Sequence, residues 1–179
     1  GLDGVDQIEW MRDYVNIWCT KLYAYTENTE ENLAEIAKND PNGIRAVQTP
    51  EWDQKYGTYW ERMNQYKKED GDKVWWYVCW RPSYPYYANL LHSDPGILHR
   101  VLFWQQKQFN VDGFLYFYAN AWGTKTGNPW TSTITNVGLS PIVYGDGLLV
   151  YNGSEVGIDG PVGSLRLEAL RDGIEDFQY

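Results

Sequence analysis

The feature that most constrains the fold is a strand–helix–strand pattern between residues 73 and 123. Residues 73–80 (KVWWYVCW) and 112–120 (DGFLYFYAN) are apolar, aromatic and β-branched runs, too short for surface helices, and are predicted to be buried strands. Between them, apolar residues recur at helical spacing from Ile97 to Leu102, after Asp94 as the predicted N-cap. Because a helix joins the two strands, they are predicted to pair in parallel.

The same alternation extends in both directions along the chain. Further buried strands are predicted near residues 15–19 and 147–151, and further helices at 28–39, at 52–69 and from Ser164 to the end. These elements predict an α/β fold with about four parallel strands alternating with helices, which is the C-terminal half of a (β/α)8 TIM-type barrel.

A half barrel on its own would expose two edge strands and an uncovered core. We therefore expect residues 1–179 to form a single partial barrel domain of a longer protein, with a natural N-terminus elsewhere. The missing N-terminal half of the barrel is then a required partner. Residues 26–58 fit the pattern poorly and are interpreted as an inserted segment.

Charge and composition limit the classes of molecule that this chain is expected to bind. The net charge of −9 includes no basic stripe, which argues against nucleic acid, and no apolar run is long enough to span a membrane. Ten Trp and fifteen Tyr against five Phe favour rings with a polar edge, which suit either sugar-binding surfaces or a large aromatic core.

No cofactor or metal is expected. His92 and His99 lie seven residues apart across a predicted helix start, so they form no metal-ligand pair. Cys19 and Cys79 show no zinc or CxxC spacing. We interpret them as buried thiols, and a disulfide between neighbouring strands is the alternative.

A series of motifs resembles the C-terminal part of the catalytic domain of glycoside hydrolase family 123, which includes β-N-acetylgalactosaminidases. The series is VNIWC, GDKVWWYVCWRP, the helix with Arg100 and Trp104, VDGFLYFYANAW, GDGLLVYNG and SLRLEALRDGIEDFQY. The resemblance covers most of the chain from Val15 onward. It implies a barrel, a glycan substrate, and export to the periplasm or the outside of a bacterial cell.

The resemblance also implies retaining hydrolysis with substrate-assisted catalysis. The 2-acetamido oxygen of the sugar attacks its own anomeric carbon, an Asp orients that group, and an adjacent Glu protonates the leaving oxygen. The chain contains no Asp-Glu dipeptide. Glu30-Glu31, Glu69-Asp70 and Glu175-Asp176 fall on predicted helices or helix ends, where solvated charge is the ordinary explanation. We therefore expect no catalytic residue in this chain, which alone should be inactive, and place the catalytic pair upstream.

Candidate sugar contacts lie at or just after the carboxyl ends of the predicted strands, because ligands of parallel α/β folds bind there. They are Trp18, Trp80, Tyr118, Asn120 and Trp122. Each could equally serve packing or capping.

Charged residues elsewhere are interpreted as structural. Arg100 is expected in an ion pair, Asp146 in a tight Gly-Asp-Gly turn, and the charges of the last helix, such as Arg166 and Asp176, on neighbouring loops.

Three functions remain open. The first is part of a hydrolase that cleaves terminal β-linked N-acetylhexosamine, with N-acetylgalactosamine favoured. The second is a non-catalytic carbohydrate-binding or scaffolding module on the same fold. The third is an enzyme complete in itself that uses Glu27, Glu51 or Asp53 of the inserted segment.

Overall fold

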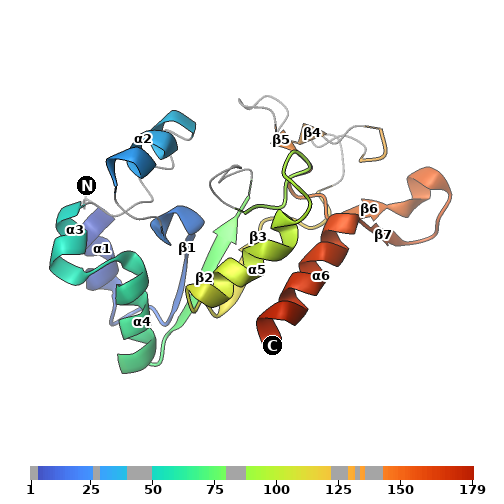
Figure 1. Ribbon diagram of the computed structural model, residues 1–179. Coiled ribbons are helices and arrows are strands. Elements are labelled where there is room, and N and C mark those ends of the chain that lie inside the picture. The colour runs from blue at the N-terminus through green and yellow to red at the C-terminus, as the bar shows by residue number, and fades with distance from the viewer. Residues whose placement is uncertain are drawn as a thin grey trace. The chain divides into compact units, whose positions relative to one another are not determined.

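The computed structural model describes residues 4–25, 29–39, 50–79, 88–121, 129–131, 134–135 and 143–179 (Figure 1). The chain divides into two compact units, Gly1–Tyr77 with Gln108–Leu115 and Val78–Lys107 with Tyr116–Tyr179. No helix of the described residues is long and apolar enough to cross a membrane.

The first unit is built on a three-stranded sheet in the order β1-β2-β3, formed by β1 (Ile17–Lys21), β2 (Lys73–Val78) and β3 (Gly113–Tyr116). β1 and β2 run parallel, with Ile17 opposite Lys73 and Lys21 opposite Tyr77. The α/β class predicted from the sequence is confirmed. The half barrel and the single domain stay predictions.

β2 was predicted to be buried throughout, and in this chain it alternates. Val74, Trp76 and Val78 are fully buried, whereas Trp75 is 36% exposed. Trp75 lies over Gly113, where an added Cβ would come within 2.5 Å of the indole ring. One face of the sheet therefore carries the core, and the other is covered only in part within this chain.

The helices of the first unit are α1 (Gly4–Met11), α2 (Glu30–Asn39), α3 (Pro50–Tyr56) and α4 (Tyr59–Glu69), with a 3₁₀ helix η1 (Leu22–Tyr25) after β1. The single helix predicted at 52–69 is wrong, because Gly57 has a φ of +81° and ends α3. Thr58 then caps α4 in a capping box with Glu61. The predicted end of the helix at Glu69 is confirmed, and Gly71 follows it with a φ of +75°.

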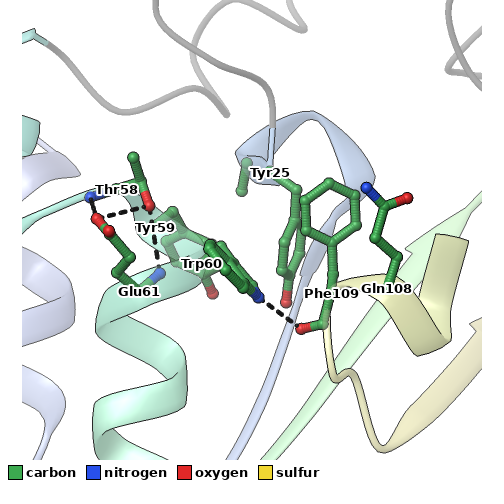
Figure 2. Close-up of a pocket in the computed structure, with 8 residues that line it drawn as sticks. Tyr25, Thr58, Tyr59, Trp60, Glu61, Gln108 and Phe109 are labelled. Atoms are coloured by element: carbon green, nitrogen blue, oxygen red, sulfur yellow. Dashed lines mark hydrogen bonds between the residues drawn. The ribbon is translucent and has the colours of Figure 1, made fainter.

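Rings from separate elements form the core of the first unit. Tyr25 packs edge-on against Tyr59, with 5.2 Å between ring centroids, and contacts Phe109 at 5.4 Å (Figure 2). Tyr25 also meets the buried Trp76 of β2 edge-on at 5.4 Å. The large aromatic core that composition left open is therefore present, and much of the Trp and Tyr content serves packing.

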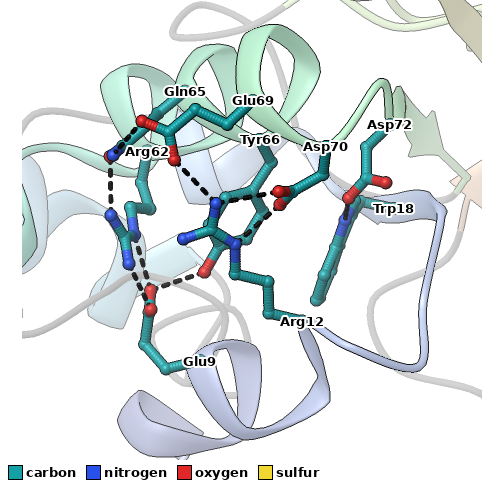
Figure 3. Close-up of polar contacts among 9 residues, drawn as sticks. All are labelled: Glu9, Arg12, Trp18, Arg62, Gln65, Tyr66, Glu69, Asp70 and Asp72. Atoms are coloured by element: carbon teal, nitrogen blue, oxygen red, sulfur yellow. Dashed lines mark hydrogen bonds and ion pairs between the residues drawn. The ribbon is translucent and has the colours of Figure 1, made fainter.

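A polar network joins α1 to α4 (Figure 3). Glu9 accepts hydrogen bonds from the guanidinium of Arg62 and from the hydroxyl of Tyr66, at 2.7 and 2.6 Å. Burial alone would raise the pKa of Glu9, but the bonds from Arg62 and Tyr66 outweigh it and the pKa is lowered. Arg12 donates to Asp70 at 2.6 Å and to Glu69 at 2.7 Å.

The second unit contains α5 (Leu98–Gln108) up to Lys107, α6 (Leu165–Gln178) and two small antiparallel sheets. β4 (Ile134–Thr135) pairs with β5 (Val143–Tyr144), and β6 (Val150–Asn152) pairs with β7 (Pro161–Gly163) across the 3₁₀ helix η3 (Gly153–Val156).

Two of the predicted elements in the second unit are corrected. The fourth parallel strand, predicted near 147–151, is instead β6 in an antiparallel pair, because Gly157 and Gly160 at positive φ return the chain onto it. Asp94 does not cap α5, since a turn from Pro95 precedes the helix, which starts at Leu98. The Asp94 carboxyl is instead buried, and burial raises its pKa to about 6.

α6 begins as predicted, because the hydroxyl of Ser164 accepts a hydrogen bond from the backbone N–H of Leu167. The helical spacing of apolar residues predicts an inner face that includes Leu165. This prediction is wrong in part, since Leu165 is 88% exposed while Arg166 and Gly173 are buried. α5 and α6 lie side by side (Figure 1). Their contact is close at Gly173, where a Cβ would lie 2.7 Å from the ring of Phe103.

Candidate functional site

The candidate site lies in the second unit, in the segment that follows β3. This segment presents two of the predicted site residues, Tyr118 and Asn120, with exposed side chains. Tyr118 is 55% exposed and has a φ of +71°, a left-handed conformation that is strained for any residue with a Cβ. Its ring contacts Phe117, with 4.0 Å between centroids. The exposed position of Tyr118 therefore comes with a strained backbone conformation.

A tight turn at residues 145–148 supports this segment. The N–H of Ala121 donates to the carbonyl of Gly147 at 2.8 Å, and the N–H groups of Leu149 and Val150 donate to Ala119 at 2.8 Å. Asn120 and Leu148 form an antiparallel bridge. Residues 119–121 are therefore held by backbone pairing with residues 147–150.

Tyr116, the last residue of β3, holds the turn through two hydrogen bonds of its hydroxyl. Its hydroxyl accepts a hydrogen bond from the N–H of Gly147 at 2.8 Å and donates to a carboxylate oxygen of Asp146 at 3.0 Å. Burial and, after it, the charge of Asp146 raise the pKa of Tyr116, so its hydroxyl stays protonated. Asp146 was predicted only as a turn former. Its carboxylate also orients Tyr116.

Arg166 holds the same turn from α6. Its guanidinium donates to the backbone carbonyls of Leu90, Gly145 and Leu148, and the Gly145 bond measures 2.8 Å. The side chain is buried, although it carries a full charge. The prediction that charges of the last helix bind neighbouring loops is confirmed for Arg166. Arg171 differs, because its ion pairs are with Glu168, Asp172 and Glu175 of α6 itself.

The predicted ion pair of Arg100 is also confirmed. Its guanidinium pairs with Asp176 at 2.5 Å, and the indole of Trp104 donates to the same carboxylate at 2.7 Å. The bond from Arg100 and the bond from Trp104 lower the pKa of Asp176 to about 2.

The ring of His92 packs against the turn at Gly145. A Cβ at Gly145 would lie 2.5 Å from the His92 ring, and Nε2 of His92 is 3.1 Å from the hydroxyl of Tyr151. Burial, the charge of Arg166 and His99 lower the pKa of His92 to about 4. The ring is therefore neutral at pH 7 and can accept a hydrogen bond from Tyr151.

We expect His92 to titrate near pH 4 rather than near its ordinary value of about 6.5. Between these two pH values the unfolded state binds more protons than the folded state, so the contribution of His92 to stability is lost as the pH falls from 6.5 to 4. Proton NMR of the imidazole, assigned by loss of the signal in His92→Gln, measures the midpoint. A midpoint above 6 would show that the ring is solvated and not packed on the turn.

A comparison with protein-family models identifies the family of this chain. The model of the glycoside hydrolase 123 catalytic domain matches residues 18–179. The chain belongs to the glycoside hydrolase 123 family. A search of curated proteins found no match for the chain.

In this glycoside hydrolase 123 chain, the five predicted sugar contacts have different positions. Tyr118 and Asn120 lie together after β3. Trp80 and Trp122 lie outside the described residues. Trp18 is in the first unit, and it is the second residue of β1, near its amino end, because the strand starts at Ile17 and not at Val15.

Trp18 has a packing role in this structure. The side chain is buried, its Nε1 donates to Asp72 at 2.7 Å, and its ring contacts Tyr66. A buried indole with a satisfied N–H at the amino end of a strand contributes to the core. Our proposals below therefore leave Trp18 out of the sugar contacts.

The acidic pairs of this glycoside hydrolase 123 chain lie on helices, as expected. Glu30 and Glu31 begin α2, Glu69 and Asp70 pair with Arg12, and Asp176 pairs with Arg100. Glu51 and Asp53 belong to the first turn of α3, and Glu27 lies outside the described residues.

The remaining residues of interest are the possible metal ligands and the two cysteines. Within the described ranges no group of three or more His, Cys, Asp or Glu side chains gathers as a metal site would require. Cys19 and Cys79 do not form a disulfide. The prediction that both thiols are buried is wrong, since Cys19 is exposed and Cys79 is half-buried.

Sequence reasoning missed the residues that position Tyr118 and Asn120. Tyr116, His92 and Arg166 act through partners that are 30, 53 and at least 18 positions away, respectively. The one signal that the sequence gives is the Gly-Asp-Gly turn itself, since two glycines that flank a turn residue allow positive φ on both sides, and Gly145 and Gly147 have φ of +75° and +74°.

Proposed function

We propose that this chain is part of a hydrolase that cleaves terminal β-linked N-acetylhexosamine, with N-acetylgalactosamine as the preferred sugar. The hydrolase class follows from the family. The choice of sugar rests on the resemblance, and it is supported by the exposed Tyr118 and Asn120 that follow β3. A phenol and a primary amide are the polar groups that fix the orientation of a sugar in a site.

The proposed reaction is retaining hydrolysis in which the substrate supplies the nucleophile. The acetamido oxygen attacks the anomeric carbon, the glycosidic bond breaks, and the leaving oxygen takes a proton from a carboxylic acid. Water then opens the cyclic intermediate and returns the proton. The catalytic Asp–Glu pair is placed in the full-length protein outside this chain, because the chain has no Asp-Glu dipeptide.

In this proposal the chain provides substrate contacts. Tyr118 donates a hydrogen bond to the acetamido group, and Asn120 bridges two hydroxyls of the sugar. Trp80 and Trp122 provide faces for the pyranose ring. The observation that carries the proposal is the outward, strained placement of Tyr118 beside Asn120, at the carboxyl end of a parallel strand.

The test is hydrolysis of p-nitrophenyl β-N-acetylgalactosaminide, with the glucosaminide and the galactoside as comparisons. We expect the full-length protein to cleave the acetamido sugars, and this chain alone to be inactive. In the full-length protein, Tyr118→Phe and Asn120→Ala should each lower kcat/KM roughly tenfold, the value of about one hydrogen bond.

The control is Tyr14→Phe, which alters an exposed tyrosine in the first unit and should leave kcat/KM unchanged. Cleavage of the galactoside as fast as the N-acetylgalactosaminide would contradict substrate assistance. If the full-length protein binds amino sugars but cleaves none of them, the binding-module alternative replaces the proposal.

A further inference from the structure

The first unit contains a pocket of about 320 Å³ to which none of the strand-end residues contributes (Figure 2). Its walls come from the end of η1, the start of α4 and the two residues that lead from α5 toward β3. The lining residues are Ala24, Tyr25, Thr58, Tyr59, Trp60, Glu61, Gln108 and Phe109. The volume is at the lower end of the roughly 300–1,000 Å³ of small-molecule sites, which suits a ligand of one ring.

The aromatic walls are held in place before any ligand arrives. Trp60 is 39% exposed, and its Nε1 donates to the carbonyl of Phe109 at 3.0 Å, which joins α4 to the chain after α5. The rings of Trp60 and Phe109 are nearly perpendicular, with 6.3 Å between centroids. The ring of Tyr25 contacts the ring of Phe109, with 5.4 Å between centroids. Binding here would therefore cost little side-chain entropy.

The polar groups of the pocket are arranged around these rings. The Glu61 carboxylate accepts bonds from the N–H and the hydroxyl of Thr58, at 2.8 and 3.0 Å, so its position is fixed. The amide of Gln108 is exposed and makes no hydrogen bond within the described chain. The pocket thus combines apolar faces with one amide that can both donate and accept.

Charge favours a neutral ligand. Glu61 is the one charged residue in the lining, and its carboxylate is engaged by the capping box at the N-terminus of α4, where the helix dipole also offsets it. An anion would be repelled by Glu61, and a cation would compete with the bonds from Thr58. Burial raises the pKa of Tyr25 and of Tyr59, so both hydroxyls stay neutral.

We propose that this pocket binds one neutral pyranose unit of a glycan. A pyranose presents an apolar C–H face, which stacks on the indole of Trp60, and equatorial hydroxyls, which the amide of Gln108 reaches. That the ligand is a sugar rests on the proposed function, because a hydrolase of glycans meets long carbohydrate chains. The pocket would then hold one sugar unit of such a chain.

The test is fluorine NMR of the full-length protein labelled with 5-fluorotryptophan, with the Trp60 signal assigned by its loss in Trp60→Phe. Methyl β-N-acetylgalactosaminide and methyl β-galactoside are the probes. We expect a saturable shift of the Trp60 signal with at least one of them. Gln108→Ala should weaken the apparent affinity about threefold to tenfold, as expected for one neutral hydrogen bond. Gln54→Ala, an exposed glutamine on α3 outside the pocket, should leave it unchanged.

The outcomes separate this proposal from the proposed function. If other tryptophan signals move and Trp60 does not, or if no tryptophan signal moves, the pocket binds no sugar and the proposal is wrong. If Trp60 moves and Gln108→Ala has no effect, the pose that we propose is wrong. If Trp60 responds while the full-length protein hydrolyses no glycoside, the pocket proposal stands and the proposed hydrolysis fails.

Discussion

Replacing Arg166 with methionine should lower the free energy of unfolding by about 3–5 kcal/mol, because three buried backbone carbonyls lose a charged hydrogen-bond donor. The substitution keeps most of the side-chain volume, but it leaves the carbonyls of Leu90, Gly145 and Leu148 without their donor. Each buried carbonyl that loses its partner costs about 1–3 kcal/mol. Urea denaturation of the full-length protein, followed by tryptophan fluorescence, measures the change.

The matched control is Arg171→Met on the same helix. The side chain of Arg171 is 64% exposed, and its partners are acidic residues of α6, so we expect a loss below about 1 kcal/mol. Arg166→Lys should fall between the two, because lysine keeps the charge but cannot donate in the planar fork that reaches three carbonyls. An equal loss for Arg166→Met and Arg171→Met would contradict the assigned role.

The contacts of Arg166 also show what the sequence could and could not predict. Local signals were sufficient for β2, α6 and its Ser164 cap, because short apolar runs and a capping hydroxyl depend on near neighbours. The strand predicted at 112–120 was too long, since β3 ends at Tyr116 and Tyr118 has a positive φ. The same rules placed Leu165 inside, and they predicted that Arg166 binds neighbouring loops but not that its side chain is buried. Arg166 is buried because it meets carbonyls 18 or more positions away, and no periodicity in the sequence encodes such a contact.

The errors in the predicted helices had local signals that the periodicity concealed. The break between α3 and α4 has a local signal, because Gly57 is followed by a Thr58-x-x-Glu61 capping box. The apolar spacing across this run nevertheless suggests one continuous helix. The strand predicted near 147–151 failed for a different reason. Its apolar run is real, since Leu148 and Leu149 are buried, but pairing is decided by the return of the chain through Gly157 and Gly160.

For the candidate site, the sequence could predict Tyr118 and Asn120 because both follow a strand with a clear pattern. It could not predict that a turn beginning at Gly145 supports them, since the supporting bonds join residues that are about 26–31 positions apart. The wrong placement of Trp18 at a strand end has the same cause, because it depends on contacts between residues far apart in the sequence. Its run looked like a strand end, and only the pairing of Ile17 with Lys73 shows where β1 begins.

Substituting Gly145 by alanine should cost about 2–5 kcal/mol of unfolding free energy, from two sources. The φ of +75° is unfavourable for a residue with a Cβ by about 1–2 kcal/mol. The new Cβ would also lie 2.5 Å from the His92 ring, and an overlap of this kind in a packed region costs about 1–3 kcal/mol. Urea denaturation of the full-length protein measures the sum.

Gly157→Ala separates the two sources, because Gly157 has nearly the same φ, +76°, and no atom within 4 Å of a new Cβ. It should cost only the backbone part, about 1–2 kcal/mol. The difference between the two variants is then the clash with His92. Adding His92→Ala to Gly145→Ala should remove that difference, which gives a coupling energy of about 1–3 kcal/mol in a double-mutant cycle. A coupling near zero would mean that the His92 ring moves aside freely. In that case the turn would be held by Arg166 and Tyr116 alone, and His92 would have no part in positioning the segment that presents Tyr118 and Asn120.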